Sequence, residues 1–322
     1  MAWRPGYVSV IDPVAPAIER VKTVLFRPFD LGRWFVIGFC AWLAQLGQQG
    51  GGGGGSGGPP GGGNLPAQIE QGAGQAREFV DANLHWLIPV AVLGVLLFVA
   101  LALLVIWLSS RGRFMFLYCV AQNRAEVVNP WRQFRRQSNS LFAFRVVLGI
   151  VAFVLVGGFA LVAVLAGVAA HAEGQLTPLA IVGIAGGAMF AAAIMILVGV
   201  AGKFTKDFVV PIMYLRTIGV LDAWTALLDV ISSNKARFFL YLLFQIAIGL
   251  AIGSMLAVAA CATCFCACCL FAIPYVGTVL LLPVHVFTRS YSLYYLAQYG
   301  PEFNAIVPEP QTTPGPAYHE QL

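Results

Sequence analysis

Long apolar stretches alternate with short polar segments along this chain, a pattern typical of proteins that cross a membrane several times. A helix needs about 20 mostly apolar residues to span a hydrocarbon core of about 30 Å. Stretches of this kind, the first weakened by glutamines at its end, are residues 31–49, 86–109, 141–170, 179–200, 238–260 and 270–291. We predict an all-α integral membrane bundle of six transmembrane helices with interfacial amphipathic helices.

Basic residues fall almost entirely on one side of the predicted spans. Of the 19 Lys and Arg residues, only Arg77 lies in a connection on the opposite side. The positive-inside rule assigns the basic side to the cytoplasm. We therefore expect a multi-pass protein of the prokaryotic cytoplasmic (inner) membrane with both termini in the cytoplasm. Arg289, near the inner end of the last span, is expected to extend toward the headgroups.

The remaining segments divide the chain into three parts. Residues 1–33 are predicted to be a cytoplasmic segment with an amphipathic helix, and residues 34–300 form the membrane domain. The Pro-rich tail, residues 301–322, is expected to be disordered. Inside the membrane domain, residues 50–63 read GGGGGGSGGPPGGG, a flexible external loop. Apolar positions at helical spacing in residues 69–84 then predict a short helix on the outer interface.

Two cytoplasmic connections resemble each other, which indicates an internal repeat. Residues 127–131 (VVNPW) align with residues 220–224 (VLDAW) at a constant offset of 93, and Arg113 matches Lys206 at the same offset. In each copy an Asn or Asp is placed where an N-cap belongs, with a tryptophan one turn inside. We predict a repeated unit in which a span is followed by a cytoplasmic interfacial helix and then by the next span.

The composition excludes several classes of function. Apolar residues make up 59% of the chain, charged residues only 10%, and the mean hydropathy is +0.81. Soluble domains have about 45–50% apolar and about 25% charged residues. A soluble enzyme, a disordered scaffold and a nucleic-acid binder are therefore excluded. The spans contain no paired carboxylates, and the chain has no H-E-x-x-H motif and no phosphate-binding loop. We expect no enzymatic activity and no cofactor.

Five cysteines lie close together near the end of the fifth span: Cys261, Cys264, Cys266, Cys268 and Cys269. Thiolates at this density bind soft metals such as Zn or Cu(I). They also form disulfides in an oxidising compartment or carry lipid. Because no His, Asp or Glu lies nearby, we favour a third interpretation, in which the cysteines are small packing residues between helices.

Arginines next to aromatic residues form a candidate lipid-binding face on the cytoplasmic side. Arg132, Arg135 and Arg136 follow Trp131 and Phe134 in the chain. An arginine near an anionic leaflet contributes about 1 kcal/mol to headgroup binding. We take Trp131, Arg132, Arg135 and Arg136 as lipid-headgroup candidates. The alternative is that these charges only set the topology.

Ionisable residues inside spans usually mark transport pathways. His285 lies within the last span, where it either hydrogen-bonds a carbonyl or relays protons. Lys203, Lys206 and Asp207 lie at the inner end of the fourth span, either as an ion pair among headgroups or as a gate. With no other intramembrane carboxylate, a proton-coupled or sodium-coupled transporter is disfavoured.

Small residues are frequent in the third and fourth spans, where they predict close helix packing. The glycines concerned are Gly157, Gly158, Gly183, Gly186 and Gly187. Gly183 and Gly187 form a small-x3-small pair, which indicates packing within the bundle as readily as a dimer face.

Three short motifs carry a resemblance to a known family. Residues 20–34 (RVKTVLFRPFDLGRW), 206–211 (KDFVVP) and 222–224 (DAW) resemble a poorly characterised family of prokaryotic polytopic membrane proteins. That family is similar to the membrane domain attached to some bacterial glycerophosphodiester phosphodiesterases. The resemblance covers most of residues 14–300 and implies a membrane fold. It implies no activity, because the catalytic residues of the phosphodiesterase barrel are missing.

These observations lead to three functional hypotheses. The first is a non-enzymatic membrane protein that organises the membrane, interacts with lipid or binds partners. Its expected partners are anionic headgroups on the cytoplasmic side and a membrane protein or a second copy of the chain, but no nucleic acid. The second hypothesis is a transporter or channel for a small solute, since many transporters contain internal repeats. The third and weakest is thiol-based metal or redox handling.

Overall fold

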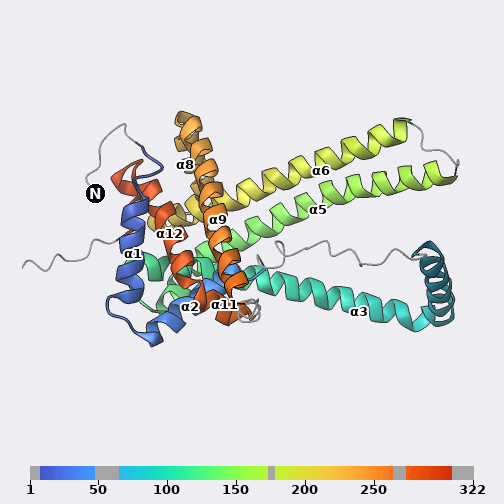
Figure 1. The fold of residues 1–322 in the computed structure, drawn as a ribbon, viewed down its shortest axis with the longest axis horizontal. Coiled ribbons are helices and arrows are strands. Elements are labelled where there is room, and N and C mark those ends of the chain that lie inside the picture. The colour runs from blue at the N-terminus through green and yellow to red at the C-terminus, as the bar shows by residue number, and fades with distance from the viewer. Residues whose placement is uncertain (1–7, 48–64, 173–177, 264–272, 307–322) are drawn as a thin grey trace, which may run out of the picture.

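The structure is a computed structural model that describes residues 8–47, 65–172, 178–263 and 273–306. All its regular elements within these ranges are helical, which confirms the predicted all-α class for this part of the chain. Figure 1 shows their arrangement. The elements are α1 Val14–Phe26, α2 Leu31–Gln45, α3 Leu65–Gln122, α4 Val128–Gln133, α5 Arg135–Ala172, α6 Pro178–Phe204, the π turn η1 Thr205–Val209, α7 Val210–Arg216, α8 Val220–Ser233, α9 Lys235–Ala262, α11 Pro274–Leu280, α12 Leu282–Ala297 and the 3-10 turn η2 Pro301–Phe303.

Among the residues that the structure describes, four helices are long and apolar enough to cross a membrane, by length and composition. They cover His85–Gln122, Arg135–Leu165, Ala185–Arg216 and Lys235–Ala262, and they contain four of the predicted spans in whole or large part. The other two predicted spans form shorter pieces. Helix α2 has 15 residues, which at a rise of 1.5 Å is only about 22 Å, and the last span is divided between α11 and α12. The count of six stays a prediction.

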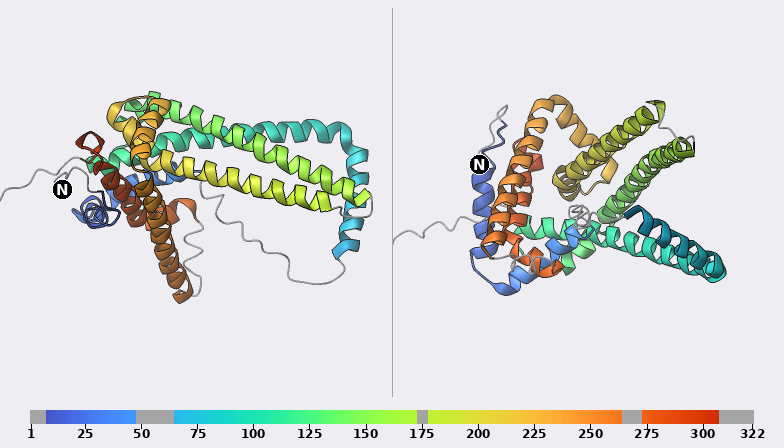
Figure 2. Two further views of the ribbon diagram at one scale, coloured as in Figure 1. Left: turned by 90° about the horizontal axis from the view of Figure 1, so that it is seen from above. Right: turned by 45° about the vertical axis from the view of Figure 1, so that its right-hand side comes forward.

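Large parts of the long helices are exposed and apolar. We call these parts the arms: residues 86–105 of α3, 147–165 of α5, 182–199 of α6 and 246–260 of α9. Phe98 is 72% exposed and Phe153 is 79% exposed. Surfaces of this kind are stable in lipid, where the helix satisfies its own backbone groups. Figures 1 and 2 show α3, α5 and α6 projecting in one general direction while α9 leaves in another.

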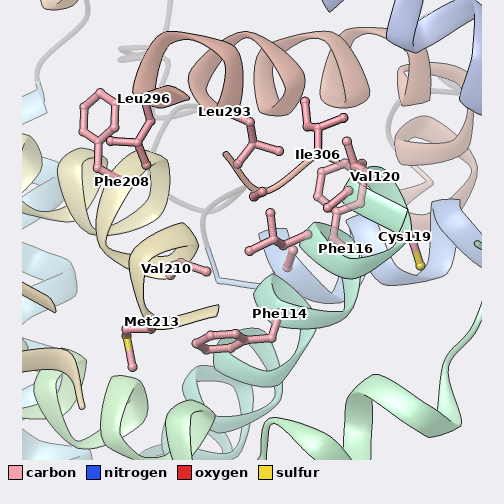
Figure 3. Close-up of a cluster of buried hydrophobic side chains, with 14 of the residues drawn as sticks. Phe114, Phe116, Cys119, Val120, Phe208, Val210, Met213, Leu293, Leu296 and Ile306 are labelled. Atoms are coloured by element: carbon pink, nitrogen blue, oxygen red, sulfur yellow. The ribbon is translucent and has the colours of Figure 1, made fainter. Parts of the chain in front are cut away.

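A core of buried apolar side chains, like that of a soluble protein, lies at the other end of these helices. We call it the base: α1, α2, η1, α7, α8, α12 and residues 109–121 of α3. Figure 3 shows part of it, with Phe114 and Val120 of α3, Phe208 of η1, and Leu293 and Leu296 of α12 packed together. All of these side chains are buried. The base therefore fixes the positions from which the arms project.

Glycine allows α2 to cross α3 at very short range. A Cβ atom on Gly112 would lie 2.5 Å from the backbone nitrogen of Ala44 and 2.5 Å from the backbone carbonyl carbon of Leu43. No larger residue fits such a backbone contact. The glycines predicted to pack the third and fourth spans do not play this part. Gly183 has open space around its Cβ position, and Gly187 meets only Phe159 at 3.8 Å.

Helix α1 is amphipathic, as predicted for the N-terminal segment, but one of its buried residues is an arginine. The Arg20 side chain donates to the carbonyl oxygen of Val120 from Nε at 3.0 Å and from Nη2 at 2.9 Å, and Nη2 also donates to Ala121 at 2.9 Å. These carbonyls belong to the last turn of α3, where regular helix partners are missing. Arg20 therefore caps α3 from a distant part of the chain.

Several predicted segments differ from the observed ones. The predicted interfacial helix at 69–84 is the first part of α3, and Figure 1 shows this part at an angle to the rest of the helix. Helix α3 contains a proline, Pro89. Residues 50–63 lie outside the described residues. The start of the predicted disordered tail is packed instead: Phe303, Ala305 and Ile306 are buried, because these apolar side chains reach the base.

The predicted repeat is only partly visible in local structure. Short helices α4 and α8 each follow a long helical run, but their N-caps are Val127 and Gly219 rather than an Asn or Asp. The predicted caps lie inside the first turns. A hydrogen bond joins the two regions, since the backbone nitrogen of Val220 donates to Oγ of Ser140 at 3.1 Å. The repeat itself stays a prediction.

Candidate functional site

A π turn interrupts the third long helical run where it enters the base. The turn covers Thr205–Val209, and Pro211 follows at the start of α7. Proline has no N–H to donate to the carbonyl four residues earlier, and its ring crowds that carbonyl. The residue concerned is Asp207. The wider turn relieves this crowding, and such turns often occur at functional sites.

Asp207 is the acceptor at the centre of a polar network. Its Oδ2 atom accepts a hydrogen bond from Nζ of Lys203 at 2.8 Å and from the Tyr241 hydroxyl at 3.0 Å. The amide nitrogen of Gln245 donates to that hydroxyl at 3.0 Å. The predicted ion pair at the end of the fourth span is thus present, and it is connected to two residues of α9 that the sequence analysis did not consider.

Two buried arginines lie beside this network. Arg289 on α12 is 6% exposed, and its Nη1 atom donates to the backbone carbonyl of Lys206 in the π turn. The expectation that Arg289 extends toward headgroups is therefore wrong, because the disturbed turn offers it a carbonyl inside the base. Arg113 on α3 is 5% exposed and interacts electrostatically with Asp207 and Arg289.

Some donors of these arginines lack partners. Within the part of the chain that the structure describes, neither Nε of Arg113 nor Nε of Arg289 has a hydrogen-bond partner. Leaving a buried polar group unsatisfied costs about 1–3 kcal/mol, and more for a charged group. Unpartnered buried donors in a folded protein call for a physical explanation.

A polar cavity of about 110 Å³ opens next to these groups. It is lined by Ala44, Gln45, Phe116, Lys203, Lys206, Asp207, Gln245, His285, Thr288 and Arg289. His285, the residue singled out in the last span, thus faces the same space as the ion pair. The lining contains three basic side chains and one carboxylate, a formal excess of two positive charges. This volume is ample for several water molecules or a small ion.

The predicted lipid-headgroup residues do not line this cavity and lie on α4 and at the start of α5. Arg132, Arg135 and Arg136 are exposed, and we call these three the arginine face. Trp131 does not stand free beside them. The guanidinium carbon of Arg111 lies 4.5 Å from the ring centre of Trp107 and 4.6 Å from that of Trp131. A cation between two indole rings is a favourable contact.

The comparison with protein families applies to most of the chain. A family of unknown function matches residues 8–282. The chain belongs to DUF7544. No curated protein and no solved structure matches it. The prediction of an uncharacterised family is confirmed, while the likeness to the membrane domain of glycerophosphodiester phosphodiesterases stays a prediction.

The DUF7544 match includes the π turn with Lys206 and Asp207 but ends before His285 and Arg289. The cavity is therefore completed by residues beyond the matched range.

A half-buried arginine joins α5 to α3 at the edge of the base. Nη1 of Arg145 on α5 donates to Oγ of Ser109 at 3.2 Å and to Oγ of Ser110 at 3.1 Å, both on α3. Sequence reasoning treated the basic residues of these helices as topology signals only. Their position within or directly after apolar runs was the available sign that some of them are buried.

Of the five clustered cysteines, one lies within the described residues. Cys261 is exposed and has a free thiol, while Cys264, Cys266, Cys268 and Cys269 lie outside the described residues. Among the described residues no group of three or more metal-binding side chains occurs. Two other cysteines, Cys40 and Cys119, are buried with their sulfur atoms 3.9 Å apart, in the packing between α2 and α3.

Proposed function

We propose that this DUF7544 chain is a non-enzymatic integral membrane protein that binds anionic lipid headgroups at the cytoplasmic surface. The observation that carries the proposal is the arginine face. Arg132 at the end of α4 and Arg135 and Arg136 at the start of α5 are exposed, on the segment that precedes the apolar arm of α5. A cation at this level of a membrane protein meets headgroups rather than bulk water.

The neighbouring aromatic residues support this location. Trp107 and Trp131 pack edge to face with ring centres 5.9 Å apart and hold Arg111 between them. Tryptophans are enriched at the interface between hydrocarbon and water. The pair therefore suits the depth at which the α3 arm would leave the membrane.

The topology belongs to the proposal as well. Six spans with both termini in the cytoplasm of a prokaryote agree with the one-sided distribution of basic residues. The likeness to the membrane domain of glycerophosphodiester phosphodiesterases also fits a protein that lies among lipid headgroups. No activity is inferred from it.

Lipid selectivity tests the proposal. Full-length protein in mild detergent is offered phosphatidylglycerol or phosphatidylcholine, and retained lipid is counted by native mass spectrometry. We expect a preference for phosphatidylglycerol that falls about a hundredfold in the variant R132Q/R135Q/R136Q, from about 1 kcal/mol per arginine. An unchanged preference in this variant would overturn the proposal.

A matched control comes from the basic residues of α1. Lys22 donates to the Glu19 carboxylate at 2.7 Å and lowers the pKa of that carboxyl below its ordinary value. Arg27 lies 3.9 Å from the same carboxylate. Because these charges are already partly balanced, K22Q/R27Q is expected to keep the lipid preference.

A transporter or channel for a small solute is the second candidate, and the polar cavity is the observation that favours it. Charged groups of α6, η1 and α12 line a space between helices, as expected of a solute pathway. Flux of small labelled anions and cations into sealed vesicles that contain the protein tests this candidate. Fluxes equal to those of protein-free vesicles would exclude it.

A further inference from the structure

The cavity carries more positive charge than its own carboxylate can balance. Of the three cations in its lining, Lys203 is already paired with Asp207 at 2.8 Å. Lys206 and Arg289 remain, and Arg113 lies close enough to interact electrostatically with both. Unbalanced charges in a protein interior cost several kcal/mol each. A bound anion would remove that cost.

Unpartnered hydrogen-bond donors on the lining residues are a second indication of a bound anion, independent of the charge balance. Arg289 is more than nine-tenths buried and lines the space, yet its Nε atom has no partner among the described residues. The Lys206 side chain makes no hydrogen bond within the same part of the chain, although its own backbone carbonyl holds Arg289 in place. Lys206 and Arg289 thus both line the space, and each has a side-chain donor without a partner among the described residues.

We propose that this cavity binds an oxyanion of the phosphate class, held by Lys206 and Arg289. A guanidinium presents parallel donors that match two oxygens of a tetrahedral anion, and an ammonium adds a point charge. The formal excess of two charges in the lining equals the charge of a phosphate dianion. The site differs from the arginine face, and it does not depend on the function proposed for that face.

The oxyanion has two sources with the same chemistry, an inorganic phosphate ion and the phosphate of a lipid headgroup. Both would meet the same two cations. The experiment therefore includes one arm for each source, and chloride at equal ionic strength separates site binding from general screening.

The test uses full-length protein that has been stripped of lipid in detergent at low ionic strength. Inorganic phosphate is titrated by calorimetry in one arm, and retention of phosphatidic acid is measured by native mass spectrometry in the other. Binding in the first arm identifies a free ion. Binding in the second arm alone identifies a lipid headgroup in the cavity if K206Q weakens it and R132Q/R135Q/R136Q does not. Binding in neither arm, or an equal effect of chloride, overturns the proposal.

Variants connect the binding to the cavity. K206Q is expected to weaken it at least tenfold, because a hydrogen bond from a charged group contributes about one to two factors of ten. Lys206 is partly exposed, so this variant is expected to fold, and R289Q serves as the second. The control R132Q/R135Q/R136Q should bind inorganic phosphate as the wild type does. Unchanged binding in K206Q overturns the assignment of the site.

Discussion

The arms of this molecule expose apolar side chains, whereas the base encloses a core that includes charged ones. In the arms, phenylalanines and leucines are exposed to the surroundings, and the most apolar parts of α3 and α5 contain no buried residue. In the base, Arg20, Arg113 and Arg289 are buried. The two regions therefore suit different surroundings. The apolar arms suit lipid, whereas in the base the protein itself covers the charged side chains.

Helix irregularities make the charged interior of the base possible. Arg20 donates to carbonyls in the last turn of α3, and Arg289 donates to a carbonyl in the π turn. A regular helix offers no such acceptors, since its carbonyls bond to its own N–H groups. Arg20 and Arg289 are therefore held in the base by carbonyls that a helix end or a π turn leaves without regular partners.

The largest expected effect separates the two regions along one helix. Gly112→Leu places a side chain where a Cβ already meets the α2 backbone at 2.5 Å, so we expect a loss of more than about 4 kcal/mol of stability. Gly94→Leu on the same helix has open space around it and should be tolerated. Thermal unfolding in detergent compares the two. Equal stability would mean that α2 and α3 do not cross as described.

A second comparison uses phenylalanines of α3. Phe114 is fully buried in the base, so Phe114→Ala should cost about 3–4 kcal/mol. Phe98 is exposed in the arm, and lipid tails can fill the space that its removal leaves. Phe98→Ala is therefore expected to change the free energy of unfolding by less than about 0.5 kcal/mol. Denaturant titration in mixed micelles measures both, and similar losses would contradict the division into arms and base.

Removing the single carboxylate of the cavity should destabilise the base. Asp207→Asn leaves Lys203, Lys206 and Arg289 without a balancing charge. We expect a loss of about 2–3 kcal/mol, below the full value for a buried pair because Lys203 is 39% exposed. Asp222→Asn on the exposed face of α8 is the control. The midpoint of thermal unfolding at low ionic strength is the measurement, and a stability equal to that of the wild type would argue against a charged interior.

The smallest predicted effect concerns one hydroxyl. Tyr241→Phe removes a donor to Asp207 and an acceptor for Gln245, which should cost about 1–1.5 kcal/mol. The hydroxyl of Tyr275 donates to the Phe35 carbonyl at an exposed position, so Tyr275→Phe should cost less. Unfolding measured by tryptophan fluorescence resolves the two variants. If the order were reversed, the network around Asp207 would contribute little.

Sequence patterns predicted the long helices well, because apolar composition and length are local properties. They did not distinguish Phe98 from Phe114, although one faces lipid and the other the core of the base. A hydropathy scale gives an apolar residue the same value whether lipid or a protein core surrounds it. Glycine spacing did not find the close helix contact within the chain either: Gly183 has open space at its Cβ position and Gly187 meets only Phe159, while Gly112 makes the contact between α2 and α3.

The sequence predicted only the part of the candidate site whose residues are close together in the chain. The spacing of Lys203 and Asp207 is one helical turn, and their ion pair was foreseen as one alternative. Arg113, Tyr241 and Arg289 come from three other helices far apart in the chain. The position of Arg113 and Arg289 within or directly after apolar runs is a local sign of burial, but only the fold shows which groups they meet.

The π turn changes which side of the helical run the side chains occupy between α6, which is exposed, and α7, which is enclosed in the base. Each residue of a helix advances the direction of its side chain by about 100°, so the extra residue in Thr205–Val209 resets the angular phase of everything after it. Before the turn, Ile196 and Leu197 point outward to lipid; after it, Val210 and Met213 are enclosed. Deleting one residue there would rotate α7 and carry its enclosed side chains off the surface they now fit.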